Sequence, residues 1–274
     1  MDNDTLVFQS FHRGPYPHWL TLCLQSVEHL ADQRGWDYEF IGDELFDLLP
    51  LWFAEKVSGR GPILSDLGRL LAARERLKRY RRVIWLDADV LIFAPERFTL
   101  PEGSFGFGRE RWVQPRAKGR GWKIHRSVCN ALCYFERDNP FLDFYIYTCQ
   151  STIKRANPEY IAPQMIGPKL LTALHNLSGF PLTECVGSAS PDLLIDIMMG
   201  EGKALDYYLQ RSNSTSSDSD ISLNIEAGLN LCHSLVDAET YRGMCLSETA
   251  LDQAAERLLS EKSLMKISMT RPHS

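Results

Sequence analysis

The sequence predicts an α/β protein with a doubly wound, mostly parallel β-sheet that is flanked by helices on both faces. Up to residue 93 of its 274 residues, short runs rich in β-branched and aromatic residues alternate with longer runs of helical period. This order is typical of parallel sheets. Two runs, 83–86 and 90–93, are apolar throughout, as strands buried on both faces are. The sequence has no repeat or linker, so we expect a single domain over residues 1–274.

The first third of the chain supplies the elements on which this prediction rests. Residues 5–11 predict the first strand and residues 36–42 the second. Between them, apolar side chains recur at helical spacing over 19–33. Another helix begins at Pro62, and residues 82–86 predict the third strand. Ligands of such sheets bind beyond the carboxyl ends of the strands, so the residues that follow the third strand are candidates for a site.

The later elements are predicted by the same patterns. Strands are expected at 103–110, 127–137 and 229–235, and helices at 139–157, 163–177, 190–210 (one or two helices) and 248–265. The segment SNSTSSDSD (212–220) has low complexity and is expected to form a mobile loop.

Composition and charge argue against several classes of protein. A formal net charge of −5 does not indicate a nucleic-acid-binding protein, and we interpret the basic segment 74–82 as a solvated helix end. The N-terminus lacks the apolar core of a signal peptide, and no run is long enough for a transmembrane helix. The seven cysteines are scattered without a CxxC pair, which is typical of reduced thiols rather than of disulfides or a zinc site. We therefore expect a cytoplasmic protein.

Two aspartates interrupt the most apolar part of the chain, RRVIWLDADVLIF (81–93). In an extended segment, residues i and i+2 point to the same side, roughly 6–7 Å apart, so Asp87 and Asp89 would face one ligand together. Burying both carboxylates without a cation would be costly, because like charges repel strongly at low dielectric. Carboxylates suit Mg²⁺ or Mn²⁺, which also accept phosphate oxygens as ligands. The pair predicts a divalent-metal site; a turn with two solvated aspartates is the plainer alternative.

Phosphatases of the haloacid-dehalogenase type use such a pair, with the first aspartate, here Asp87, as nucleophile. Their DxD motif normally lies on the first strand, and a further acidic motif comes after it. The nearest acidic motif in this chain, GDELFD (42–47), precedes the pair. This class therefore fits the order of motifs poorly.

The surroundings of the pair resemble nucleotide-sugar glycosyltransferases of the GT-A fold. The segment ILSDLGRLLAARERLKRYRRVIWLDADVLIF (63–93) is similar to their SDxxR helix, apolar strand and DxD motif. It looks most like the sugar-binding-region DXD transferases, which include capsular polysaccharide transferases and the glucosylating domains of large bacterial toxins. The resemblance starts at residue 5 and becomes thin beyond about residue 180. It implies a Rossmann-like GT-A domain, with a nucleotide-binding half at about 1–110 and an acceptor half at about 111–274.

The resemblance also implies a donor-binding site. Asp66 and Arg69 share one helical face and would hydrogen-bond hydroxyls of the donor sugar, with Arg69 able to reach a phosphate. An ordinary i,i+3 ion pair is the alternative for these two residues. Phe8, Gln9 and Ser10, at the end of the first strand, would contact the nucleobase and ribose.

The remaining implied residues lie further along the chain. Asn130 is a polar residue in an apolar strand and therefore needs a partner. By resemblance it would face the sugar or the acceptor. Gln164 and Gly167 would approach the donor, and His233 would join Asp87 and Asp89 as a metal ligand. A packing role is the alternative for each of them.

These expectations describe a hexosyltransferase that depends on Mn²⁺ or Mg²⁺ and takes a UDP- or GDP-hexose as donor. The acceptor is not readable from the sequence, and the segments 109–127 and 186–228 are expected as loops near it. Catalysis would fall to Asp66, Arg69, Asp87 and Asp89, with retention of configuration as in the resembled group. Inversion would need a carboxylate base, for which Asp192 and Asp196 are conceivable. The open alternatives are the phosphatase and a non-catalytic nucleotide-sugar-binding protein.

Overall fold

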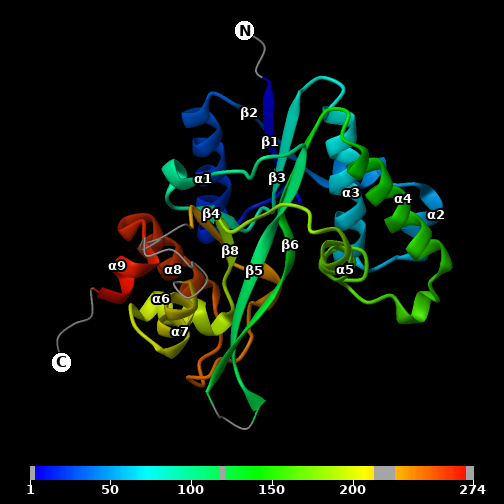
Figure 1. The fold of residues 1–274 in the computed structure, drawn as a ribbon. Coiled ribbons are helices and arrows are strands. Elements are labelled where there is room, and N and C mark those ends of the chain that lie inside the picture. The colour runs from blue at the N-terminus through cyan, green and yellow to red at the C-terminus, as the bar shows by residue number, and fades with distance from the viewer. Residues whose placement is uncertain (1–3, 118–120, 213–225, 270–274) are drawn as a thin grey trace.

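The computed structural model describes residues 4–117, 121–212 and 226–269 (Figure 1). Its helices and strands, in chain order, are β1 (Thr5–Ser10), α1 (His18–Arg34), β2 (Asp37–Ile41), α2 (Leu51–Lys56), α3 (Gly61–Arg76), β3 (Arg82–Leu86), β4 (Val90–Ile92), β5 (Phe105–Pro115), β6 (Trp122–Glu136), α4 (Pro140–Arg155), α5 (Pro168–Ser178), β7 (Leu182–Thr183), β8 (Val186–Ser188), α6 (Pro191–Met199), α7 (Lys203–Ser212), β9 (Gly228–Asn230), α8 (Glu248–Glu261) and α9 (Leu264–Met269).

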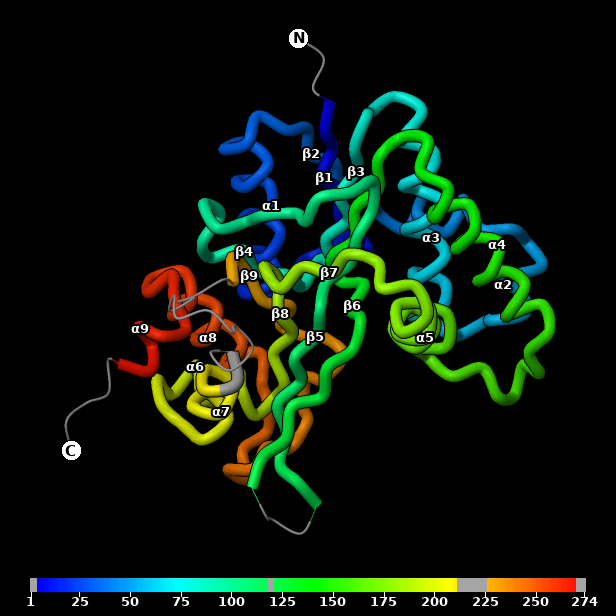
Figure 2. Tube along the Cα trace, in the orientation of Figure 1, coloured from blue at the N-terminus to red at the C-terminus, as the bar shows by residue number. Residues whose placement is uncertain are grey.

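The main sheet has the strand order β2-β1-β3-β6-β5-β7. Strand β1 is parallel to β2 and β3, β6 is antiparallel to both of its neighbours, and β7 is parallel to β5. Five of the six strands therefore run in one direction. A second sheet, in the order β4-β9-β8, lies beside α1 (Figure 2). The expected doubly wound, mostly parallel sheet is confirmed.

Helices cover both faces of the main sheet: α2 to α5 lie on one side, and α1 and α6 to α9 on the other (Figure 1). The strands alternate accordingly. Val83 and Trp85 of β3 belong to the core shared with α3 and α4, whereas Ile84 and Leu86 pack with α1. Side chains of a strand point alternately to opposite faces, so a strand buried on both faces is apolar throughout. The next residue on the α3 face after Trp85 is Asp87.

Several predicted boundaries are wrong, for local physical reasons. The helix expected at 248–265 is broken at Lys262, which takes the left-handed conformation (φ 54°). The segment 190–210 forms two helices, which is one of the two outcomes expected, and they are separated at Gly200 (φ 82°). The strand expected at 229–235 ends at Asn230, because the chain turns at Cys232 (φ 52°). Most of the predicted mobile loop, 213–220, lies outside the described residues.

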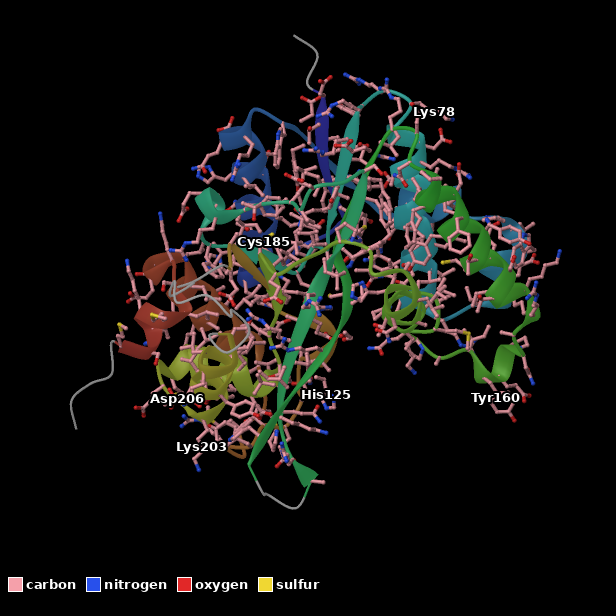
Figure 3. The ribbon with its side chains drawn as sticks, viewed as in Figure 1. Lys78, His125, Tyr160, Cys185, Lys203 and Asp206 are labelled. Carbon is pink, nitrogen blue, oxygen red and sulfur yellow. The ribbon has the colours of Figure 1, made fainter. Side chains whose placement is uncertain are left out.

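Residues 109–127, expected as a loop, instead belong largely to the β5–β6 hairpin, where Arg109 pairs with Val128 and Pro115 with Trp122. The solvated helix end predicted at 74–82 is confirmed up to Arg81: α3 ends at Arg76, and Arg74, Lys78, Arg79 and Arg81 are exposed, whereas Arg82 begins β3. Its side chains pair with nearby acids, as in Lys78–Glu75 (2.5 Å). Figure 3 places Lys78 of this segment at the opposite end of the molecule from His125 of the hairpin. Over the ranges described, no helix combines the length and the apolar character needed to cross a membrane.

Candidate active site

The aspartate pair lies where the chain passes from one sheet to the other. Strand β3 ends at Leu86 in the main sheet, and β4 begins at Val90 in the smaller one. The Asp87 carbonyl accepts the N–H of Val90 (3.0 Å), which closes a turn over residues 87–90. The predicted extended geometry is therefore wrong, because this backbone bond bends the chain between the two acids. Both side chains nevertheless line the same cavity.

Asp87 faces the helix α3. Its Oδ1 accepts hydrogen bonds from Arg69 Nη1 (2.8 Å) and from the indole Nε1 of Trp85 (2.6 Å). Its side chain remains 26% exposed, so it is open to the cavity. Its charge is matched by the guanidinium of Arg69.

Asp89 is held from the other side, by the segment that follows β9. Its Oδ1 accepts from Asn230 Nδ2 (3.0 Å) and its Oδ2 from the backbone N–H of His233 (2.9 Å). The Asp89 carbonyl also accepts the N–H of Leu231 (2.8 Å). Burial and the neighbouring Asp87 raise the pKa of the Asp89 carboxyl to about 6. A carboxylate with neutral donors and a raised pKa is one that a cation would stabilise.

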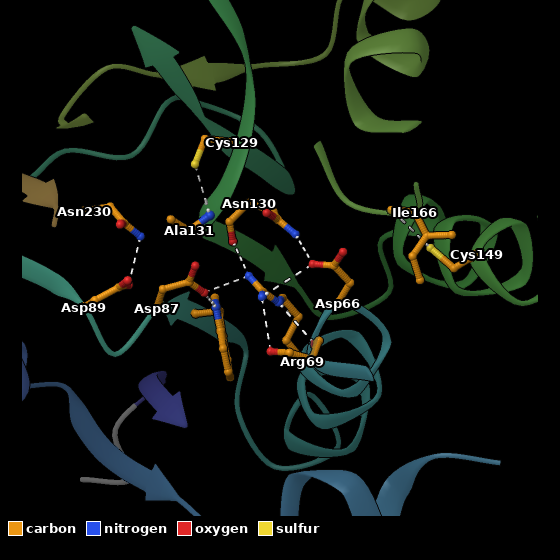
Figure 4. A network of polar contacts seen from close by, with 12 residues as sticks. Asp66, Arg69, Asp87, Asp89, Cys129, Asn130, Ala131, Cys149, Ile166 and Asn230 are labelled. Carbon is orange, nitrogen blue, oxygen red and sulfur yellow. Dashed lines mark hydrogen bonds and ion pairs between the residues drawn. The ribbon is translucent and has the colours of Figure 1, made fainter. Parts of the chain in front are cut away.

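Arg69 joins the parts of the site (Figure 4). Besides Asp87, its Nη1 donates to the backbone carbonyl of Asn130 (2.7 Å), and its Nη2 lies 3.5 Å from Asp66 Oδ1. Burial opposes its charge, but Asp87 and Asp66 outweigh burial and raise the pKa of the guanidinium. The predicted Asp66–Arg69 pair is thus a buried pair within a larger network.

Asp66 and Asn130 are bonded directly, because Asn130 Nδ2 donates to Asp66 Oδ1 (2.7 Å). This bond supplies the partner that a polar residue in an apolar strand requires. Burial raises the pKa of the Asp66 carboxyl to about 6. Gly167, the residue before α5, lies directly against the pair: a Cβ there would overlap the Asp66 carboxylate and approach Asn130 Nδ2 to 3.0 Å. Only glycine leaves this wall of the site uncrowded.

These side chains surround a cavity of about 390 Å³ at the carboxyl end of β3. Its lining consists of Ser10, Phe11, Gly61, Pro62, Ser65, Asp66, Arg69, Trp85, Asp87, Ala88, Asp89, Asn130, Pro163, Gln164, Pro168, His233 and Ser234. Three carboxylates and one guanidinium give these four ionised side chains a formal charge of −2. An anionic ligand would therefore need added positive charge.

The residues at the end of β1 take different positions from one another. Ser10 lines the cavity, but Phe8 and Gln9 are fully buried. Gln9 Nε2 donates to the Asp87 carbonyl (3.0 Å), and the Tyr38 hydroxyl donates to Gln9 Oε1 (3.1 Å). Phe8 packs edge-on against Trp85, with ring centroids 5.2 Å apart. Gln9 therefore bonds the backbone of the aspartate turn, and Phe8 packs against the tryptophan that precedes it.

His233 lies at the cavity, but its ring packs against Phe11 (5.5 Å between centroids) and Trp19 (5.8 Å). In the portion of the chain described, no three His, Cys, Asp or Glu side chains gather into a group that encloses a metal. The donor set nonetheless fits Mg²⁺ or Mn²⁺, which bind through one or two carboxylates and complete their shell with phosphate and water. Asn230, whose amide oxygen accepts the Cys232 N–H (2.7 Å), is committed to bracing Asp89.

The two conceivable bases lie elsewhere. Asp196 is fully buried, and its carboxylate accepts the N–H groups of Ala204 and Leu205 at the start of α7 and the hydroxyl of Tyr241. Asp192 accepts the backbone N–H of Tyr241 (2.7 Å). Neither lines the cavity. Both acids have structural roles in connecting α6 to the segments that follow it.

Sequence reasoning missed several residues of the site. Trp85 shares the face of β3 with Asp87, so strand alternation would have found it. Ser65 precedes Asp66 on α3, and its Oγ accepts from Arg69 Nη2 (3.3 Å). Phe11 and Ser234 carry no signal in the sequence, because tertiary folding alone brings them to the cavity.

No protein-family model matches the chain, and no curated protein matches it. Several solved structures are similar. A glycosyltransferase involved in the glycosylation of the major capsid of PBCV-1 is 10% identical, with a TM-score of 0.41, over 92% of this chain and 98% of that one. The galactosyltransferase LgtC, in complex with donor and acceptor sugar analogs, is 13% identical, with a TM-score of 0.40, over 92% and 95%. Mouse xyloside xylosyltransferase 1 is 13% identical, with a TM-score of 0.35, over 65% and 83%. At these identities and TM-scores the likeness assigns no function to this chain.

Proposed function

We propose that the chain is a metal-dependent glycosyltransferase that moves a hexose from a UDP- or GDP-sugar to an acceptor. The observation that carries the proposal is the cavity itself, in which Asp87 and Asp89 stand beside the Asp66–Arg69–Asn130 network. A divalent ion would balance the two excess negative charges and so admit a diphosphate. In this proposal Asp66 and Asn130 would bind hydroxyls of the sugar, and Asp87 and Asp89 would bind the cation that a diphosphate requires.

Each residue has a definite task in this proposal. Asp87 and Asp89 would hold Mn²⁺ or Mg²⁺, with His233 in reach of the same ligand. When bound, the ion would act as a Lewis acid that neutralises the charge of the departing nucleoside diphosphate. Asp66 would accept a hydroxyl of the sugar, and Arg69 would orient the sugar or a phosphate by charge-assisted hydrogen bonds. Gly167 would let the sugar lie close to Asp66, and Gln164 would contact it from the same side.

Retention of configuration is part of the proposal. An inverting transferase uses a carboxylate base on the acceptor side. The two acids considered for that task, Asp192 and Asp196, are engaged with α7 and with Tyr241. Their engagement favours retention. A phosphatase with Asp87 as nucleophile is disfavoured by the order of motifs, because the acidic segment 42–47 precedes the aspartate pair.

The direct test is hydrolysis of nucleotide-sugars in the absence of acceptor. A panel of UDP- and GDP-hexoses is incubated with the protein and MnCl₂, and release of UDP or GDP is measured. We expect slow release with at least one donor, and a loss of about 10²-fold or more in Asp89→Ala, since a group that stabilises developing charge contributes on this scale. Asp47→Ala, at an exposed site outside the cavity, serves as the matched control and retains activity.

Three results would contradict the proposal. Absence of both binding and hydrolysis for every donor would overturn it. Turnover of simple phosphate esters through an aspartyl-phosphate at Asp87 would identify a phosphatase instead. Metal-dependent binding of a donor without any hydrolysis or transfer would identify a nucleotide-sugar-binding protein.

A further inference from the structure

Trp85 connects the buried core to the aspartate pair. It lies on β3 two residues before Asp87, so both side chains point to the face covered by α3. Only 2% of Trp85 is exposed, yet it borders the cavity. Its Nε1 donates to Asp87 Oδ1 at 2.6 Å, the length of a strong hydrogen bond to a charged acceptor. Of the two side chains described as donors to this carboxylate, Trp85 and Arg69, the indole is the more buried.

The ring of Trp85 also contacts the other partner of Asp87. The guanidinium carbon of Arg69 lies 4.9 Å from the centroid of the indole, within the range of a cation–π interaction. The indole also packs edge-on against the buried Phe8, which restricts rotation of the ring. One rigid side chain therefore positions both members of the Arg69–Asp87 ion pair.

The consequence concerns the two oxygens of Asp87. Oδ1 accepts both the Nη1 of Arg69 and the Nε1 of Trp85, at 2.8 and 2.6 Å. A carboxylate oxygen with two such donors has little capacity left for a cation. The indole and the guanidinium together prevent the carboxylate from rotating, and Oδ2 becomes the oxygen available to the cavity.

We infer that Trp85 is a positioning residue of the proposed metal site: its N–H selects Oδ2 of Asp87 for the ion, and its ring holds Arg69 against the same carboxylate. This inference rests on the proposed function. It assigns to Trp85 an effect on metal affinity that packing alone does not predict. Replacing a residue that hydrogen-bonds a metal ligand typically lowers the affinity for the metal by about 10- to 100-fold.

The test is the affinity of the 274-residue chain for Mn²⁺, measured by isothermal titration calorimetry with MnCl₂ alone and with UDP or GDP present. In Trp85→Phe a smaller aromatic ring replaces the indole, and the N–H is lost. We expect Mn²⁺ to bind about 10-fold more weakly than to the wild type. Trp36→Phe makes the same chemical change where the ring packs on Phe98, away from the cavity, and should leave the affinity unchanged.

A second variant separates the N–H from packing. Replacing Trp85 with β-(3-benzothienyl)alanine keeps the shape of the side chain and exchanges only the N–H for sulfur. It should lose affinity as Trp85→Phe does, while cooperative thermal unfolding shows that the fold is retained. Wild-type affinity in this variant would overturn the inference and leave the proposed function intact. A wild-type protein that binds no Mn²⁺, with or without nucleotide, would overturn both.

Discussion

At the scale of the residue, the three carboxylates of the cavity differ in their partners. Asp87 is paired with a guanidinium at 2.8 Å, whereas Asp89 accepts only from neutral donors, an amide and a backbone N–H. Asp66 stands between these cases, with Asn130 at 2.7 Å and Arg69 at 3.5 Å. An added cation therefore gains most from Asp89, whose charge nothing else in the cavity matches. This difference is the reason to choose Asp89 for the test of activity.

The buried Asp66 predicts a pH dependence of stability. Its folded-state pKa, about 6, lies above the ordinary pKa of an aspartate, 3.8, because burial penalises the ionised form. The corresponding stability is fully present below the unfolded pKa and is lost as the pH rises through about 6. Between about pH 5 and about pH 7.5, we expect the wild type to lose about 1 to 2 kcal/mol relative to Asp66→Asn. Urea unfolding of both proteins at the two pH values measures the difference. Equal changes in the two proteins would contradict the raised pKa.

At the scale of the element, a turn between two sheets explains why acids interrupt an apolar sequence. Residues 83–86 and 90–92 are buried in different sheets. Of the described residues 83–92, Trp85 and the three residues between the strands, 87–89, line the cavity. Asp87 follows β3 and faces α3, where Arg69 lies. Pairing of β4 with β9 brings Asn230 and His233 to Asp89. Each acid is thus positioned by a different sheet.

The buried Asp196 holds the start of α7. Four donors converge on the buried Asp196: two backbone N–H groups of α7, the Tyr241 hydroxyl and Arg242 Nε (2.9 Å). Asp196→Ala leaves them without this acceptor, and we expect a loss of about 3 to 5 kcal/mol in the free energy of unfolding. Turnover per folded molecule should not change. Asp143→Ala, which removes an exposed partner of Arg74, should cost less than about 1 kcal/mol. A specific loss of turnover in Asp196→Ala would return this residue to the candidate bases.

The elements that the sequence predicts well are those with strong periodicity. The helix expected over 19–33 is α1 (His18–Arg34), and the strand expected over 82–86 is β3. Errors occur where tertiary hydrogen bonds decide the backbone. The last strand stops at Asn230 because Leu231 and His233 donate to Asp89, far away in sequence. Gln9 is expected at the nucleobase and ribose, and its bond to the Asp87 carbonyl, which no local pattern reveals, holds its side chain in the core of the protein.

At the scale of the whole molecule, the cavity lies where separate parts of the chain meet. Asp66 and Arg69 come from α3, the aspartate turn from the end of β3, Asn130 from β6, Gln164 from the segment before α5, and His233 from the segment after β9. The helices that contribute lie on one side of the main sheet, and the segment after β9 belongs to the other. A ligand in this cavity would therefore contact segments that belong to the hydrophobic cores on the two sides of the main sheet.

Contact with both cores predicts that metal and nucleotide stabilise the whole fold. A ligand that binds only the folded state adds about 2.7 kcal/mol at 100 times its Kd. For a protein of this size that gain corresponds to a rise of about 5 to 10 °C in Tm. We expect such a shift with MnCl₂ and UDP or GDP together, in a thermal-unfolding assay, and its reversal by EDTA. Asp89→Ala should lose the shift, because Asp89 borders the cavity, and Asp47→Ala should keep it, because Asp47 does not. A shift that persists in Asp89→Ala or in EDTA would mean that the nucleotide binds without the aspartate pair, and the charge argument for a metal at this site would fail.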